Sequence, residues 1–365
     1  MISSSRPEEY AAHPVPSLGE WHEMWRNWDT ITLQMIPHDE LYEKPIKLRN
    51  ACIFYLGHVP TFLDIKLTEA TKTPPTEPAY FYNIFERGID PDVDNPEQCH
   101  AHSEIPDTWP SLDIILQFQQ GVRERVTKLY ESGQAYNDAW TGRTLWLGLE
   151  HEMMHMETLL YMLVQSDKTL PPAGVMLPDF EHMAAQAKQQ AVENEWFDVP
   201  ERSINIGLHD PDTADGPARY FGWDVERPPY QAHVKAFKAK GRPITNGEYA
   251  KYMSENGIEQ IPVSWIPEKQ TNGANGVNDQ LTNGALALHN AIDGKAVRTV
   301  YGPVPLRLAL DWPVAASYDE LLGCAQYMGG RIPTMEEARS IYVHAELQKD
   351  SVVNALGKKI PAVNG

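Results

Sequence analysis

Long apolar runs and cysteines are scarce in this sequence of 365 residues. No run approaches the ~18 apolar residues that a membrane-spanning helix needs, and the first residues contain no apolar stretch of the signal-peptide type. The three cysteines, Cys52, Cys99 and Cys324, have neither metal-binding nor redox spacing, which is typical of a reducing compartment. We therefore expect a cytoplasmic protein without a membrane partner.

Positive charge is also in deficit, with 31 Lys and Arg against 50 Asp and Glu and a formal net charge of −19. This balance repels nucleic acid, and no Lys/Arg cluster or stripe of alternating basic and aromatic residues opposes it. A glycine-rich phosphate loop of either common type is missing as well. We therefore expect no nucleic-acid partner, and the oligomeric state stays open.

Length and hydrophobic content indicate two globular domains. A chain of 365 residues with 42% hydrophobic content is long enough to bury two ordinary cores. After residue 166 the sequence changes from helical periodicity to short strand-like segments. We therefore place a helical domain at 15–168, a linker at 169–198 and a second domain at 199–365.

The segment 145–163 carries the strongest chemical signal. It contains no proline and one glycine, and its apolar residues recur at helical spacing, so His151 and His155 should leave one face of one helix. Two neutral imidazoles placed in this way can bind one divalent metal ion. The alternative is that both are ordinary core histidines. Glu150, Glu152 and Glu157 lie in the same two turns and favour a metal site, because carboxylates often hydrogen-bond to metal-binding histidines.

The same residues spell HExxH, the zinc-protease helix in which the glutamate, here Glu152, is the general base. The long form of that motif requires glycine three and histidine six residues after the second histidine. This chain has Thr158 and Tyr161 there. The short form requires a distant glutamate as third ligand, which the pattern leaves open. In either case another ligand has to come from elsewhere in the chain.

Helical periodicity predicts four helices before residue 166, at 17–36, 46–70, 111–131 and 143–165. Ser17 and Glu20 form a capping-box pattern at the first helix, and Pro60 is expected to kink or interrupt the second. The long connection 71–110 is expected to be a packed crossover loop. Four helices with one long crossover describe a four-helix bundle, whose core can hold a metal between facing helices.

His58 is the best candidate for the third ligand, because it is the one histidine on an otherwise apolar face of the segment 46–70. A lone histidine on such a face is more often a core residue, but the facing pair of histidines favours a ligand. A second cluster, Cys99, His100 and His102 in the crossover, is a much weaker metal candidate.

Turn signals in the second domain separate strand-like segments at 203–207, 220–223 and 233–237. Helix-like pieces are expected at 180–195, 246–255 and 317–328. The Asn/Gly-rich stretch 271–294 carries Thr-Asn-Gly-Ala twice and is expected to be a loop.

Five motifs follow the order found in the ergothioneine-type sulfoxide synthases, which this chain resembles over about residues 18–340. Those enzymes join a DinB-like helical bundle to a domain like the formylglycine-generating enzymes. The motifs are Leu56-Gly57-His58, His151-xxx-His155-x-Glu157, Phe221-Gly-Trp-Asp-x-Glu226-x-Pro228, Pro243-Ile-Thr-Asn-Gly-Glu-Tyr249 and Gly329-Gly-Arg-Ile-Pro-Thr334. The resemblance implies an α + (α+β) fold, a DinB-like four-helix bundle followed by a partial formylglycine-generating-enzyme (C-type-lectin-like) domain.

The resemblance also implies one mononuclear non-haem Fe(II) held by His58, His151 and His155. The implied reaction joins the imidazole carbon of hercynine to the sulfur of cysteine with O₂ and leaves a sulfoxide. Three neutral histidines on one face of Fe(II) leave adjacent positions open for thiolate and O₂. Glu152, about 60° around the helix from His155, is expected to orient an imidazole N–H. No further catalytic residue is assigned.

Two departures from the family pattern stand out. Met154 replaces a glutamine that meets the substrate imidazole in bacterial relatives. The family's second domain also continues past Thr334 into a tryptophan-rich segment, and in the fungal form, which this chain most resembles, a methyltransferase precedes the bundle. We expect this chain to lack both parts and to be catalytically weak or silent, with 256–365 mobile and protease-sensitive.

Three alternatives stay open. A histidine–cysteine (ovothiol-type) sulfoxide synthase would have almost the same sequence. An HExxH zinc hydrolase would use Glu152 as its base. A non-catalytic module would use the metal for stability alone.

Overall fold

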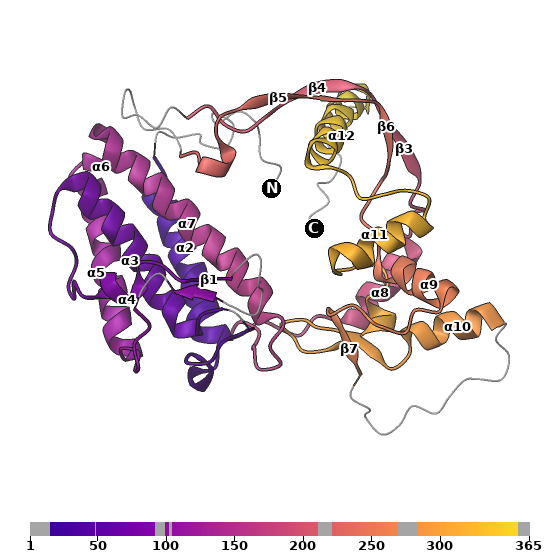
Figure 1. The fold of residues 1–365 in the computed structure, drawn as a ribbon, viewed down its shortest axis with the longest axis horizontal. Coiled ribbons are helices and arrows are strands. Elements are labelled where there is room, and N and C mark those ends of the chain that lie inside the picture. The colour runs from indigo at the N-terminus through magenta and orange to yellow at the C-terminus, as the bar shows by residue number, and fades with distance from the viewer. Residues whose placement is uncertain are drawn as a thin grey trace.

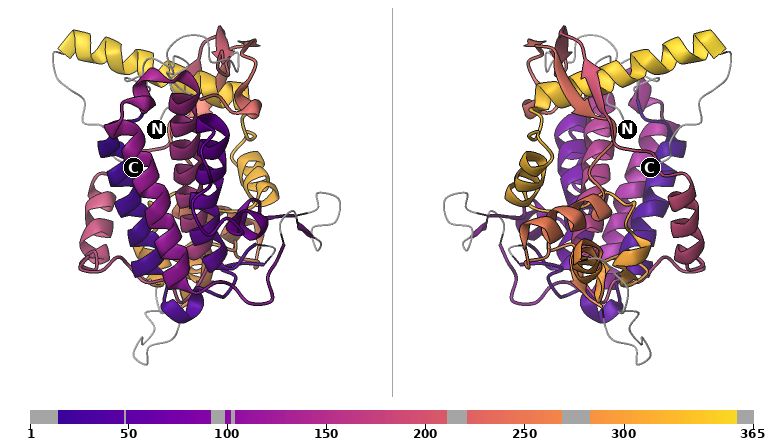
Figure 2. Two further views of the ribbon diagram at one scale, coloured as in Figure 1. Left: turned by 90° about the vertical axis from the view of Figure 1, so that its left-hand side faces the viewer. Right: turned by 90° about the vertical axis from the view of Figure 1, so that its right-hand side faces the viewer.

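The computed structural model describes residues 15–47, 49–91, 99–101, 104–210, 221–268 and 283–356. Figure 1 shows a helical bundle, coloured from indigo to magenta, beside a second half of short strands and helices that begins near residue 169. The long helices of the bundle run side by side in both further views (Figure 2). Within the described residues, no helix is both long enough and apolar enough to cross a membrane.

The described part of the bundle has four long helices, which confirms the predicted architecture: α2 (Leu18–Thr30), α3 (Cys52–Thr71), α5 (Leu112–Glu131) and α7 (Ala139–Leu163). Ser17 and Glu20 form the predicted capping box, and a π-helix at Ile31–Met35 prolongs α2. The carboxylate of Asp138 accepts the Thr141 N–H, which caps α7. For this reason α7 begins earlier than the predicted residue 143.

α3 is the central helix of the bundle, and every residue from Cys52 to Thr61 is buried. It begins at Cys52, later than the predicted residue 46, because the Cys52 N–H already bonds to the Glu43 carbonyl of the preceding loop at 3.1 Å. Pro60 does not interrupt the helix, so that part of the prediction is wrong, whereas the kink stays a prediction. A proline inside a helix costs about 3 kcal/mol, and burial on all sides of α3 offsets this cost.

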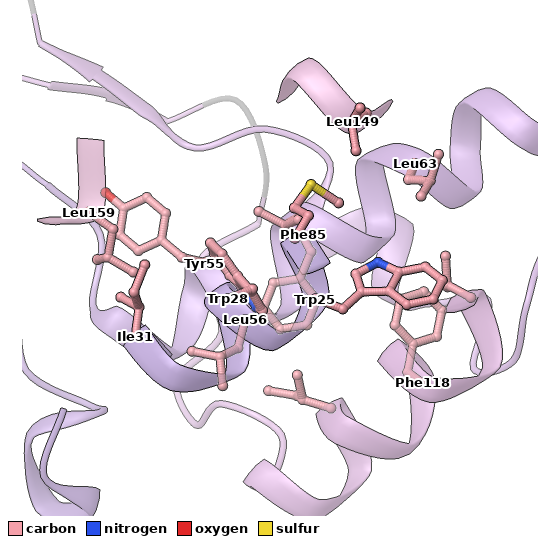
Figure 3. Close-up of a cluster of buried hydrophobic side chains, with 14 of the residues drawn as sticks. Trp25, Trp28, Ile31, Tyr55, Leu56, Leu63, Phe85, Phe118, Leu149 and Leu159 are labelled. Atoms are coloured by element: carbon pink, nitrogen blue, oxygen red, sulfur yellow. The ribbon is translucent and has the colours of Figure 1, made fainter. Parts of the chain in front are cut away.

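Large aromatic and aliphatic side chains of the bundle fill one core (Figure 3). Part of this core comes from α4 (Phe81–Phe85), a short helix inside the crossover. The Phe81 ring lies edge-on to Phe85 and Phe118, with centroids 5.0 and 4.9 Å apart, a favourable arrangement for aromatic rings. The expectation of a packed crossover is therefore confirmed for this part of it.

The crossover also contains an antiparallel hairpin, β1 (Ile89–Pro91) with β2 (Cys99–Ala101). Two members of the weak metal candidate, Cys99 and His100, fall in β2, where only the backbone is described, and His102 lies outside the described residues. That candidate stays a prediction.

The second half contains small antiparallel sheets and several helices. β3 (Trp196–Val199) pairs with β6 (Phe237–Lys240), and β4 (Arg202–Ile206) pairs with β5 (Tyr230–Val234). β8 (Lys295–Val297) lies between β7 (Trp265–Pro267) and β9 (Val304–Pro305). The helices are α8 (Phe180–Gln189), α9 (Asn246–Asn256), α10 (Asn283–Ile292), α11 (Tyr318–Tyr327) and α12 (Met335–Leu356), the last beside β4 and β5 (Figure 1). Strand 203–207 and helices 180–195, 246–255 and 317–328 are thus confirmed within a few residues, although α8 already ends at Gln189.

Two predicted strands differ from the structure. The segment 233–237 is divided between β5 and β6, because the chain there leaves its pairing with β4 and enters its pairing with β3. Residues 221–223 form no strand and lead into a 3₁₀ turn, Asp224–Glu226. The Glu226 carboxylate accepts the Trp223 N–H at 3.0 Å, so a cap takes the place of strand pairing. Tyr220 lies outside the described residues.

The stretch 271–294 is not wholly a loop, contrary to our prediction. α10 forms within it because Leu288, Ala291 and Ile292 pack against a second core built around Tyr249 and Trp265. The part of this stretch before residue 283 lies outside the described residues. A helical bundle followed by helices with small sheets agrees with the predicted α + (α+β) class, while the domain bounds stay predictions.

Candidate metal centre

Three histidines from two helices of the bundle converge on one point. His58 comes from α3, and His151 and His155 come from successive turns of α7. Nε2 of His155 lies 3.1 Å from Nε2 of His58 and 3.2 Å from Nε2 of His151. The three ligand atoms all lie within 4.8 Å of one another. The structure therefore brings together the three residues that the sequence analysis singled out.

The spacing of these nitrogens suits a metal ion. Imidazole nitrogens bind metals at about 2.1 Å, so two of them at right angles around one ion lie roughly 3 Å apart. Both short Nε2 pairs have this spacing. Nε2 of His155 faces two other ring nitrogens, and one proton on it can serve only one of them. A cation among the three lone pairs satisfies all of them, so the donor set fits a divalent metal.

The orientation of His58 is set by the crossover. Its Nδ1 lies 2.7 Å from the backbone carbonyl oxygen of Phe85. A carbonyl can only accept, so Nδ1 carries the proton and Nε2 presents its lone pair to the other histidines. Gly57 makes this contact possible, because a Cβ there would lie 2.4 Å from the Phe85 ring. The Leu-Gly-His motif thus has a physical basis: the glycine admits the residue that orients the histidine.

The two histidines of α7 are held by aromatic packing. The His151 ring stacks on Phe62 of α3, with centroids 3.8 Å apart and planes at 19°. The His155 ring lies 5.8 Å from the Tyr55 ring, and its Nδ1 is buried with no hydrogen-bond partner among the described residues. Nε2 at the three-histidine cluster is therefore the polar contact of His155.

Burial keeps the three imidazoles neutral. It lowers the pKa of His155 to about 3, and the nearby His58 adds to this effect. Burial likewise lowers the pKa of His58 and, together with His155, the pKa of His151. Metal binding requires neutral imidazole, so no ligand has to lose a proton at neutral pH.

A close approach of α3 and α7 brings the two sets of ligands together. A Cβ on Gly148 of α7 would lie 2.5 Å from Cδ1 of Leu63 on α3. Leu63 and the surrounding core side chains are shown in Figure 3. Gly148 lies about one turn before His151, so this close approach is next to the site. Gly148 is the one glycine of the segment 145–163, and the sequence alone gave it no role.

Glu152 is not paired with either imidazole of α7. Its side chain is buried, and burial raises the pKa of its carboxyl to about 8. The charges that act on it are Arg123 of α5 and Asp29 of α2. Among the described residues no hydrogen bond joins Glu152 to His151 or to His155, whose Nδ1 is unpartnered. A direct bond from Glu152 to an imidazole N–H is therefore not part of this structure.

The residues that attach the second half to the bundle were not among those predicted from the sequence. Arg143 of α7 makes two hydrogen bonds to Asp210 at 2.7 and 2.6 Å. Trp223 donates its indole N–H to Glu150 of α7 at 2.9 Å. The motif at 221–228 pointed to the loop itself, but nothing in the sequence pattern connected Arg143 with Asp210.

Comparison with known proteins shows what the chain is similar to. Residues 20–159 match the DinB superfamily, so a DinB-like domain is present. The whole chain is 53% identical to Ergothioneine biosynthesis protein 1 of Neurospora crassa and spans 43% of that protein. It is 34% identical over 90% of its length to the protein of the same name from Schizosaccharomyces pombe and spans 42% of it. The predicted resemblance to ergothioneine-biosynthesis proteins is confirmed, and the chain spans less than half the length of these relatives.

Proposed function

We propose that this chain, with its DinB-like bundle and its full-length similarity to part of the ergothioneine biosynthesis proteins, contains the iron centre of a sulfoxide synthase. Its substrates would be hercynine, cysteine and O₂. His58, His151 and His155 would hold one Fe(II). We also propose that residues 199–365 belong to a domain like the formylglycine-generating enzymes and that the protein is cytoplasmic. The motifs from Phe221 to Thr334 and the small number of cysteines support these two points.

The convergence of three neutral Nε2 atoms is the observation that carries the proposal. His58 is held in the tautomer that metal binding needs by the Phe85 carbonyl. The other two rings are buried against Phe62 and Tyr55. A set of three nitrogen ligands leaves the remaining positions of an ion free for substrates. Structural zinc sites, in contrast, are closed by four protein ligands.

When bound, Fe(II) supplies the activation of O₂ and a coordination site for the thiolate. The residues of this chain would bind the metal, orient its histidine ligands and exclude water from the site. His155 is the most exposed of the three ligands, whereas His58 and His151 are buried. Substrates should therefore reach the centre from the side of His155.

The metal assignment is tested by ligand variants. His58→Ala, His151→Ala and His155→Ala should each lower Fe(II) affinity by more than the roughly 10–100-fold that loss of a supporting residue costs. The measurement is anaerobic titration with Fe(II) against a competing chelator. His38→Ala, at an exposed histidine that is not part of the cluster, is the control. Tight binding by His58→Ala would remove His58 from the site.

The substrate assignment is tested by oxygen uptake. After anaerobic loading with Fe(II), hercynine plus cysteine should consume O₂ at the low rate expected from the sequence and yield a sulfoxide that mass spectrometry detects. Histidine plus cysteine is the parallel assay, and a preference for it would make the chain an ovothiol-type synthase. Fe(II) binding with no oxygen uptake from either pair would support the non-catalytic module instead.

The zinc hydrolase is the second candidate, because the HExxH pattern is present. The burial of Glu152 near Arg123 and Asp29 argues against it, since a general base has to reach a metal-bound water. Glu152→Gln would abolish hydrolysis by such an enzyme. A sulfoxide synthase would keep most of its activity in the same variant.

A further inference from the structure

A buried ion pair joins the second half to α7, the helix that carries His151 and His155 and is called the metal helix below. The two guanidinium nitrogens of Arg143 bond to the two carboxylate oxygens of Asp210 at 2.7 and 2.6 Å. The side chains are only 10% and 4% exposed. A two-pronged pair of this kind fixes orientation as well as distance. The start of α7 is therefore held in a defined relation to the segment that ends at Asp210.

Asp210 also orders the loop Phe221–Arg227. Its Oδ2 accepts the Gly222 N–H at 2.9 Å. The Arg143 guanidinium lies over the Phe221 ring, 4.9 Å from its centroid, which adds a cation–π contact. One ion pair thus connects three segments: α7, the chain before Asp210 and this loop.

Trp223 continues the attachment toward the metal centre. Its indole N–H donates to Oε2 of Glu150 at 2.9 Å, and Glu150 directly precedes the ligand His151. The backbone N–H of Trp223 donates to Glu226, so the indole is presented by an ordered turn. The Trp223 ring also lies edge-on to Phe221, with centroids 5.1 Å apart.

The surface of α7 beyond this attachment stays open. Met153 and Met154, which precede the partly exposed His155 in the sequence, are 40 and 41% exposed. α7 is the bundle helix that makes these contacts, and it lies toward the second half in Figure 1. The loop therefore contacts α7 at Arg143 and Glu150, whereas the exposed residues next to His155 stay accessible to substrates.

We propose that Arg143 and Glu150 are positioning residues that hold the loop Phe221–Arg227 beside the metal helix during the reaction. Substrate groups bound by the second half then meet the metal centre in one fixed geometry. An error of about 1 Å in such a geometry can cost on the order of 100-fold in rate. The kinetic part of this inference rests on the proposed function, whereas the docking of the loop does not.

The test separates the hydrogen bond from other effects of substitution. Glu150→Ala removes the acceptor for the Trp223 indole, Glu150→Gln keeps an acceptor oxygen, and Trp223→Phe keeps a ring but removes the donor. Asp167→Asn is the matched control, because Asp167 pairs with Arg298 across the same two halves on an exposed surface. Each full-length variant is compared with the wild type in hydrogen–deuterium exchange, Fe(II) affinity and steady-state kinetics.

In Glu150→Ala and Trp223→Phe, the amides of residues 221–234 should exchange up to roughly tenfold faster, as expected for the loss of one hydrogen bond. Fe(II) affinity should stay within about threefold, less than a supporting residue of a ligand would cost. KM for the imidazole substrate should rise and kcat should fall. Glu150→Gln and Asp167→Asn should resemble the wild type in all three measurements.

Unchanged exchange in Glu150→Ala would overturn the docking role. Faster exchange with an unchanged KM and only a smaller active fraction would indicate a purely structural contact and overturn the positioning role. A wild type that binds Fe(II) but turns over no imidazole–thiol pair would contradict the proposed function. In that case the hydrogen–deuterium exchange of the variants would still show whether Glu150 and Trp223 hold the loop against α7.

Discussion

A single residue, Phe85, supports both members of the Gly57-His58 pair. Its ring fills the space that a side chain at position 57 would need, and its carbonyl oxygen accepts the His58 Nδ1 proton. The Phe85 side chain is fully buried, and close-packed surroundings leave it little room to move. A change at position 57 should therefore be felt at the metal site.

Gly57→Ala is predicted to weaken metal binding without removing a ligand. The new Cβ would lie 2.4–2.6 Å from three atoms of the Phe85 ring, so the ring and its carbonyl have to shift away from His58. Fe(II) affinity should fall roughly 10–100-fold, the usual effect of losing a group that orients a ligand. Overpacking should also lower the free energy of unfolding by about 1–3 kcal/mol. Chelator competition and chemical unfolding measure the two effects.

Gly19→Ala is the control for that variant. Gly19 is exposed on α2, and a Cβ there meets only Ser17 Oγ at 3.7 Å, an ordinary contact. The free energy of unfolding should stay the same or rise by up to about 1 kcal/mol, because alanine is the better helix former. An equal loss of metal affinity in both variants would show that the Phe85 contact is not the cause.

At the scale of elements, the crossover before α5 depends on one buried carboxylate. Asp64 of α3 is fully buried and accepts hydrogen bonds from Thr76, Tyr82 and Arg125. These contacts fasten the chain that leads into α4, whose last residue, Phe85, orients His58. The candidate ligand on α3, His58, is thus supported from six residues further along the same helix.

Asp64→Ala is predicted to destabilise the bundle by about 3–5 kcal/mol, since it leaves the Arg125 charge and several donors without their acceptor. Residues 72–86 should become the first site of limited proteolysis. Fe(II) affinity should also fall, because this segment carries Phe85, which orients His58. Glu69→Gln, in an exposed pair with Lys66, should change stability by less than about 1 kcal/mol. Comparable losses in the two variants would contradict the central role of Asp64.

The bundle was predictable because its signals are local. The capping box at Ser17, the periodicity of α5 and α7, and the pair His151 and His155 each follow from residues close together in the sequence. His58 could be predicted as the third ligand because a bundle brings facing helices together. Its support by Phe85 could not, since that contact joins residues 27 positions apart through a backbone carbonyl.

The second half was harder to predict because its short elements depend on distant partners. Phe237 begins β6 only because β3 lies beside it, and α10 forms where a second core receives its apolar face. The position of Glu152 shows the same limit. Helical geometry gave its angle from His155, but the tertiary packing of α2 and α5 placed Asp29 and Arg123 around it.

At the scale of the whole molecule, all three candidate ligands belong to the bundle, while the second half touches it at both ends of α7. Arg143 and Glu150 make the contacts of the first part of α7, and Asp167 pairs with Arg298 just beyond its last residue. The stretch between these contacts includes exposed Met153 and Met154. Metal binding and substrate positioning should therefore be separable properties of the molecule.

The bundle alone, residues 15–168, is predicted to bind Fe(II) nearly as tightly as the whole chain. Its core contains the Phe85, Phe62 and Asp64 contacts that hold the ligands, so affinity should fall by less than the roughly tenfold effect of losing one supporting residue. Oxygen uptake with an imidazole and a thiol should disappear, because substrate positioning needs the second half. Chelator competition on both forms, each with its His155→Ala variant as the blank, gives the comparison. An affinity more than about a hundredfold weaker in the bundle, beyond the range for supporting residues, would mean that the second half shapes the metal site itself.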